Sequence, residues 1–168
     1  MDLLVFANGF ALWGDARFRC ALGAAGVQKE KCEGDRATPE GVFPFRRVLY
    51  RADRLAAPNT RLPMATIAPE DGWCDDPGHR AYNQPVTLPF AASAERLWRE
   101  DARYDLVLIP GHNDAPATPG KGSAIFVHLT DAAYSPTEGC VALALADLQK
   151  ILSQAGPGDR LCLSADAL

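Results

Sequence analysis

The stretch HLTDAAYSPTEGCVAL, residues 128–143, joins two apolar segments through a turn-rich link and carries one histidine and one cysteine. His128 lies in the apolar run SAIFVHL, which predicts a buried strand whose alternation turns the imidazole away from its two neighbours. Cys140 follows Gly139 and precedes the second apolar segment, VAL. The link is turn-rich and can fold back, so the sequence allows the thiol and the imidazole to lie near each other.

This pair has two interpretations. Cysteine attacks as a thiolate, and a free thiol is mostly protonated at neutral pH, so a catalytic Cys140 would need His128 as its base. Gly139 would let the backbone bend so that amides of the turn point at a developing oxyanion. The alternative is a buried core thiol beside a core histidine whose polar atoms are satisfied elsewhere.

The other histidines and cysteines favour structural roles. His79 lies in the turn DDPGHRAY, and His112 lies in a loop that follows an apolar strand. Five cysteines is an odd number, and the chain contains no CxxC pair and no zinc-type spacing with histidine. We therefore expect no disulfide framework, no metal centre and no cofactor.

Length and composition indicate one globular domain spanning residues 1–168, with 48% hydrophobic and 23% charged residues. A net charge of −4, without a basic aromatic stripe, gives no case for binding nucleic acid or an anionic membrane. No apolar run approaches 18 residues, so we expect no membrane span. The first twenty residues lack the pattern of a secretory leader, which taken literally predicts a cytoplasmic protein. Oligomeric state is not predicted.

Strand patterns dominate the chain. Apolar or alternating runs predict strands over residues 3–7, 43–54, 104–113, 123–129 and 159–165. The Pro- and Gly-rich segment 58–89 predicts a long structured loop with short strands. Two helices are expected, one over Ala92–Asp101 and one over residues 143–156. The sum is a mainly β fold with two or so helices.

The stretch 128–143 resembles the signature of the L,D-transpeptidase (YkuD-type) catalytic domain family. That signature has a histidine, a gap, then Ser/Thr-His-Gly-Cys and an apolar residue, and the matching residues are His128, Thr137, Gly139, Cys140 and Val141. EGDRATPEGVF and GSAIFVH resemble further family segments, so the likeness runs from about Gly34 onward. The resemblance implies curved mixed sheets arranged as a YkuD-like β-sandwich.

The resemblance also implies a reaction on peptidoglycan stem peptides. Cys140 would attack the carbonyl before a terminal D-amino acid and form a thioester, with His128 as base and then acid. Amides near Gly139 and Cys140 would hold the oxyanion, and a backbone carbonyl would orient His128. Transfer to an amine of another stem gives a crosslink in the periplasm or cell envelope. Transfer to water gives an L,D-carboxypeptidase or amidase of peptidoglycan recycling, for which a cytoplasmic location is the alternative.

Two positions depart from the family pattern. Glu138 stands where the signature has a second histidine, and a carboxylate there disfavours the thiolate of Cys140 unless it is paired or turned away. Ala142 stands where many members have arginine. These departures leave a third hypothesis open, a catalytically silent module that binds stem peptides and has an unreactive Cys140.

Substrate contacts would therefore come from other positions. Arg99 and Arg51 are candidates for gripping a substrate carboxylate, because a guanidinium binds carboxylates with two hydrogen bonds. Asn113 and Ser123 flank the strand that carries His128 and are candidates either for hydrogen-bonding a peptide backbone or for capping turns, and Glu138 is a further candidate substrate contact.

Overall fold

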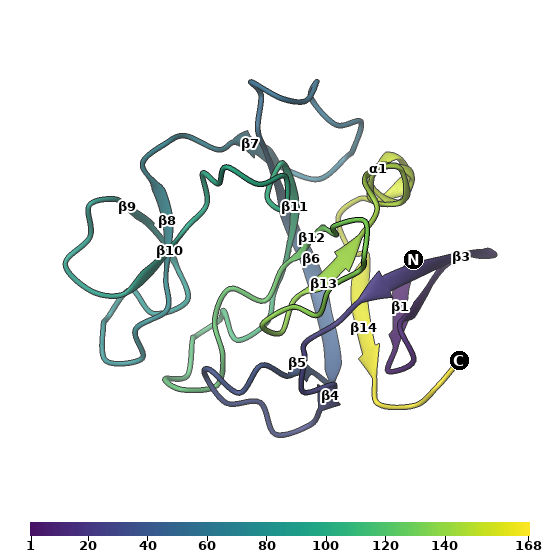
Figure 1. Ribbon diagram of the computed structural model, residues 1–168, viewed down its shortest axis with the longest axis horizontal. Helices are drawn as coiled ribbons and strands as arrows, with labels where there is room; N and C mark the ends of the chain where they lie inside the picture. The colour runs from purple at the N-terminus through teal and green to yellow at the C-terminus, as the bar shows by residue number, and fades with distance from the viewer.

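The computed structural model describes residues 1–168, which form fourteen strands and one helix (Figure 1). In chain order they are β1 (Asp2–Phe6), β2 (Phe10–Trp13), β3 (Ala16–Ala21), β4 (Val27–Gln28), β5 (Thr38–Pro39), β6 (Gly41–Tyr50), β7 (Met64–Thr66), β8 (Asp71–Cys74), β9 (Pro85–Thr87), β10 (Ala94–Arg96), β11 (Leu106–Pro110), β12 (Val127–Leu129), β13 (Val141–Leu143), α1 (Leu145–Gln154) and β14 (Arg160–Ser164).

A nine-stranded sheet organises the molecule, in the order β11-β12-β13-β3-β2-β1-β14-β6-β7. The sheet is mixed, because β1 pairs with β14 and β12 with β13 in parallel while most other neighbours are antiparallel. Since β11 also pairs with β6, the sheet curves back on itself. The prediction of a mainly β fold with curved mixed sheets is confirmed.

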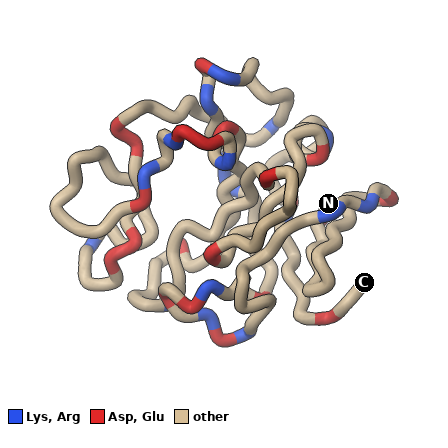
Figure 2. The backbone as a smooth tube through the Cα atoms, in the orientation of Figure 1, with Lys and Arg blue, Asp and Glu red and all other residues tan.

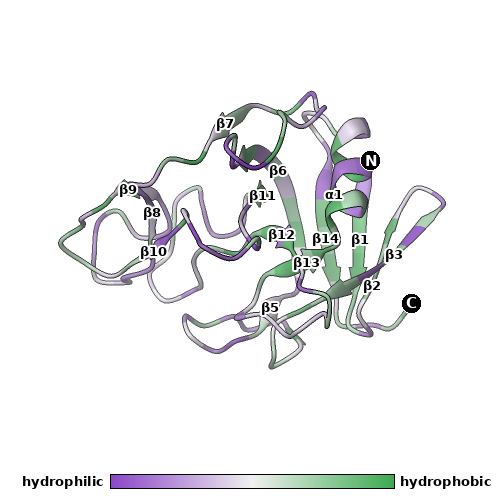
Figure 3. Cartoon of the chain, turned by 45° about the horizontal axis from the view of Figure 1, so that its top comes forward, coloured by the Kyte–Doolittle hydropathy of each residue, from purple (hydrophilic) through white to green (hydrophobic).

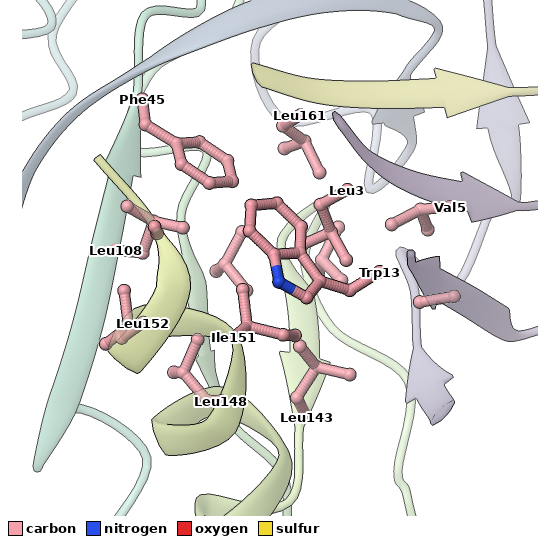
Figure 4. Close-up of a cluster of buried hydrophobic side chains, with 14 of the residues drawn as sticks. Leu3, Val5, Trp13, Phe45, Leu108, Leu143, Leu148, Ile151, Leu152 and Leu161 are labelled. Carbon is pink, nitrogen blue, oxygen red and sulfur yellow. The ribbon is translucent and has the colours of Figure 1, made fainter. Parts of the chain in front are cut away.

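The main core lies inside this curved sheet and is closed by α1 (Figure 4). Leu148, Ile151 and Leu152 are fully buried at helical spacing on the inner face of α1. The indole of Trp13 lies among them, stacks on Phe45 and donates a hydrogen bond to the side chain of Gln154, at the end of the helix. Burial of this apolar face is what fixes the helix against the sheet.

A second, smaller layer is formed by the strands β10, β8 and β9, which stand beside the main sheet (Figure 1). It contains most of the segment 58–89, which has short strands as predicted. Figure 3 shows hydrophobic residues concentrated on the strands around α1, whereas the loops near β8, β9 and β10 are mixed in hydropathy.

The helix predicted over Ala92–Asp101 is absent, and this prediction was wrong. The segment instead contains β10, which pairs with β8 so that Glu95 lies opposite Trp73. Leu97 is buried, and the guanidinium of Arg51 lies 3.4 Å over the ring of Trp98. Tertiary pairing has overridden a weak helical pattern that lacked a complete capping box. The other predicted helix is α1, whose ten residues are too few to span a membrane.

Candidate active site

His128 and Cys140 are brought to one pocket by the parallel pair β12 and β13. His128 lies opposite Ala142 in the register of these strands, and Cys140 directly precedes β13. Val127 and Leu129 pack into the main core, while alternation leaves His128 to line a pocket of about 450 Å³ together with Cys140. The structure therefore places the two predicted catalytic residues in one cavity.

The thiol of Cys140 is held by backbone groups and not by the imidazole. Sγ donates to the carbonyl oxygen of Ala124 at 3.2 Å and accepts from the N–H of Phe126 at 3.3 Å. Burial raises the pKa of the Cys140 thiol to about 12, and the negative charge of Glu95 acts in the same direction. In the resting site the sulfur is thus a protonated thiol.

The imidazole of His128 is oriented by its own strand. Its Nδ1 lies 2.9 Å from the carbonyl oxygen of Leu129, which requires Nδ1 to carry the proton and leaves Nε2 with a free lone pair. The ring of Tyr104 packs edge-on at a centroid distance of 5.2 Å. Burial lowers the pKa of His128 to about 4, so the imidazole is neutral at neutral pH and able to accept a proton at Nε2.

The turn before Cys140 leaves two backbone N–H groups without a hydrogen-bond partner, those of Glu138 and Cys140. The N–H of Gly139 donates to the hydroxyl of Thr137 at 3.1 Å, and that hydroxyl donates to the carbonyl of Cys140 at 2.7 Å. The N–H of Cys140 has no hydrogen-bond partner. Gly139 has φ +134°, and a Cβ there would lie 2.7 Å from the carbonyl oxygen of Ala37, so only glycine fits. Of the two predicted oxyanion donors, Cys140 has a free amide and Gly139 does not.

Charged side chains of both signs line the pocket. The sequence interpretation missed Glu33, Asp75, Glu95, Arg103 and Tyr104, which the fold gathers there from β10 and from loops. Figure 2 shows acidic and basic residues alternating along the loops on this side of the molecule. Glu95 and Tyr104 are joined by a hydrogen bond from the phenol to the carboxylate. No local pattern in the sequence indicates that these residues converge.

The two pocket arginines differ in their freedom. Arg99 is fixed by two hydrogen bonds to Asp101, at 2.8 and 2.6 Å. Arg103 approaches the carboxylate of Asp131 only at 3.7 Å, and 42% of its side chain is exposed. Arg103 is therefore the guanidinium that is more available to a ligand in the pocket.

Glu138 and Ser123 also line the pocket. Glu138 is 79% exposed and pairs with Arg36 at 3.1 Å, so it is both turned outward and neutralised by a partner. The hydroxyl of Ser123 donates to the carboxylate of Glu33 at 2.7 Å.

Two further candidates lie outside the pocket. The side chain of Asn113 hydrogen-bonds backbone groups of Thr118 and Gly122, which makes it a loop-stabilising residue. Arg51 is buried, and its guanidinium donates two hydrogen bonds to the carboxylate of Asp53. No group of three or more His, Cys, Asp or Glu side chains is arranged to hold a metal ion.

The fold and sequence match known proteins. A family model described as the L,D-transpeptidase catalytic domain, YkuD, matches residues 3–161. The solved structure of the helical cell shape determining protein Pgp2 from Campylobacter jejuni is similar with a TM-score of 0.50 and 13% identity, over 99% of this chain and 48% of that chain. The structure of a lysine-to-alanine mutant of Pgp2 has a TM-score of 0.49 and 13% identity, over 99% of this chain and 47% of that chain. The chain thus spans about half the length of these structures, and the likeness to them is one of fold. No curated protein matches the sequence.

Proposed function

The chain belongs to the L,D-transpeptidase catalytic domain family, and on that premise we propose that residues 1–168 form one cysteine-dependent acyltransferase domain that crosslinks peptidoglycan stem peptides. The main support is that Cys140 and His128 line one pocket while the N–H of Cys140 has no partner. A nucleophile, a base and an oxyanion donor are the three groups that acyl transfer through a thioester requires.

Acylation follows from the protonation states at rest. Because the thiol pKa lies far above that of the imidazolium, Cys140 and His128 remain uncharged until a substrate arrives. The thiol proton then passes to Nε2 of His128 as Sγ attacks the carbonyl before the terminal D-amino acid. The oxyanion that forms accepts a hydrogen bond from the N–H of Cys140. When the C–N bond breaks, His128 protonates the departing amine and a thioester remains.

Deacylation uses the same groups in reverse. An amine of a second stem attacks the thioester, gives a proton to His128 and forms the new amide bond. The C–S bond of the thioester breaks, Cys140 departs from the acyl carbon as a thiolate, and its sulfur recovers the proton from His128. Because peptidoglycan lies outside the cytoplasmic membrane, this reaction would take place in the periplasm or cell envelope.

Arg103 is proposed to bind the terminal carboxylate of the donor peptide. The position that carries arginine in many family members is Ala142, which is 1% exposed and lies opposite His128 in the strand register. Arg103 supplies positive charge to the pocket of Cys140 and His128 from the loop before β11. A guanidinium that is only loosely paired can exchange Asp131 for a substrate carboxylate.

The test is incubation of the purified protein with disaccharide-tetrapeptide muropeptides, followed by mass spectrometry, with Cys140→Ala as the control. A crosslinked dimer that is absent with Cys140→Ala is the expected result. Tripeptide alone would overturn crosslinking in favour of L,D-carboxypeptidase activity through the same thioester. No product, together with a Cys140 that iodoacetamide does not label, would overturn both in favour of a silent binding module.

A further inference from the structure

Ala124 has a backbone conformation that alanine rarely adopts, and it lies directly against the candidate nucleophile. Its φ is +50°, in the left-handed region that side chains with a Cβ disfavour. Ala124 lines the pocket, is buried, and uses its carbonyl oxygen to accept the hydrogen bond from Sγ of Cys140. Strained residues of this kind persist only where neighbouring groups hold them.

The group that holds Ala124 is the side chain of Asn83. The N–H of Ala124 donates to Oδ1 of Asn83 at 3.0 Å, and the same oxygen accepts the indole N–H of Trp73 at 2.9 Å. Nδ2 of Asn83 donates to the carbonyls of His112 and Asn113 at 2.9 and 2.8 Å. All four hydrogen-bonding positions of this buried amide are therefore used.

One chain of contacts thus runs from β8 and the loop after β11 to the sulfur. Asn83 fixes the N–H of Ala124, and the left-handed conformation of Ala124 sets the direction of its carbonyl. That carbonyl accepts the hydrogen bond from the thiol of Cys140. The thiol is held between this carbonyl and the N–H of Phe126, beside its own free amide. Neither of these two partners is a side chain, so the position of Sγ depends on backbone geometry.

We propose that Asn83 is a positioning residue for Cys140. Asn83 acts through the strained backbone of Ala124 to hold the protonated thiol in its resting position. The inference rests on the proposed role of Cys140 as nucleophile. Without the Asn83 amide, Ala124 relaxes toward negative φ and its carbonyl turns away from the sulfur. The neutral thiol then loses its acceptor, which favours the thiolate, while the sulfur loses its alignment for attack.

The test uses Asn83→Ala, Asn83→Ser, Ala124→Gly and the two double variants, with thermal melting as the check on folding. Iodoacetamide labelling of Cys140 between pH 6 and 10 needs no substrate and reports thiol reactivity. In both Asn83 variants we expect faster labelling at pH 7, about tenfold for each unit by which the thiol pKa falls. Turnover of muropeptides should fall by roughly 10- to 100-fold, as for a displacement of about 1 Å.

Ala124→Gly is the rescue substitution combined with each Asn83 variant, because glycine adopts positive φ without a steric penalty. In the double variants it should restore both slow labelling and turnover toward wild type. Labelling that is unchanged in the Asn83 variants, or defects in labelling, turnover or folding that Ala124→Gly does not rescue, would make Asn83 a structural residue and overturn the proposal. A wild-type protein without turnover would instead contradict the proposed function, and the labelling results would still decide the role of Asn83.

Discussion

The strands around α1 and the loops around the pocket keep their shapes by different means. The main core contains 21 buried hydrophobic residues, most of which belong to regular strands and one helix. The pocket is bounded by loops whose polar side chains hydrogen-bond backbone groups, as Asn83 does, or each other, as Ser123 and Glu33 do. Non-glycine residues with positive φ occur outside the strands of the main sheet, at Asn83 and Ala124 among others.

This difference predicts that stability and the proposed reactivity depend on separate parts of the molecule. Burial of apolar area is roughly additive and tolerant of small movements, so it suits a scaffold. Directional hydrogen bonds fix atoms more narrowly, so they suit a site. Substitutions in the two regions should therefore fail in different ways, and the following predictions try to break that separation.

The largest effect is expected for Cys140→Ala, which should abolish turnover because it removes the nucleophile. Only one sulfur atom is deleted, so the melting temperature should stay close to that of the wild type. Muropeptide turnover and thermal melting, measured on the same preparation, check this. Retained turnover would show that Cys140 is not the nucleophile.

His128→Ala should lower turnover by about 10²- to 10⁴-fold, the range for loss of a general base. The acyl-enzyme should form slowly and still contain Cys140, which intact-protein mass spectrometry can follow. His112→Ala is a matched control, because that histidine is also buried but lies outside the pocket. Equal loss in both variants would mean that the loss reflects folding and not base catalysis.

A substitution in the main core should lower the stability of the fold and leave turnover unchanged. Leu152→Ala should lower the free energy of unfolding by about 2–5 kcal/mol, because Leu152 is fully buried and its removal leaves a cavity in the main core. Turnover per folded molecule should remain unchanged. Leu145→Ala, on the exposed side of the same helix, should change stability by less than about 0.5 kcal/mol. A large change of turnover in Leu152→Ala at full folding would break the separation of the two regions.

Lowering the pH should reduce the free energy of unfolding, because His128 is buried without a proton. Its pKa is about 4 in the folded chain and 6.5 in its ordinary state, so the unfolded chain binds more protons between these values. Stability therefore rises with pH across this window and is lost as pH falls through it. Between pH 7 and pH 5 the loss should be about 2 kcal/mol from this residue. Chemical denaturation of wild type and His128→Gln at both values measures it, and an equal loss in both proteins would refute it.

The smallest effect is expected for Arg103→Ala, about a tenfold fall in turnover, because a partly exposed charged hydrogen bond to the substrate is lost. The matched control is a donor peptide whose terminal carboxylate is an amide. Wild type and variant should process that peptide equally. A variant that is equally slow on both peptides would show that Arg103 does not recognise the carboxylate.

The sequence predicted those parts of the molecule that depend on local pattern. An apolar run identified the strand that carries His128, and the spacing at Leu148, Ile151 and Leu152 identified α1, whereas the three-residue strand β13 after Cys140 was not predicted. The false helix at 92–101 shows the limit, because β10 exists only through pairing with β8. That error also concealed Glu95, which belongs to β10.

Other features depend on contacts that are distant in sequence. Tyr104 and Arg103 reach the pocket only because β11 pairs with both β6 and β12. Asn83 offered one local clue, since asparagine tolerates the left-handed conformation in turns. Its hydrogen bond to Ala124, 41 residues along the chain, has no counterpart in any local pattern.

The parallel pairing of β1 with β14 has a consequence for synthesis on the ribosome. Leu3 meets Leu161 and Val5 meets Leu163 in that register, and β14 also separates β1 from β6. Until Ser164 has been made and released from the exit tunnel, the nascent chain carries two uncovered strand edges and cannot close its sheet. Such edges are templates for association with other chains. We therefore expect folding to finish after translation of β14, and chaperones that shield strand edges to raise the yield of soluble protein.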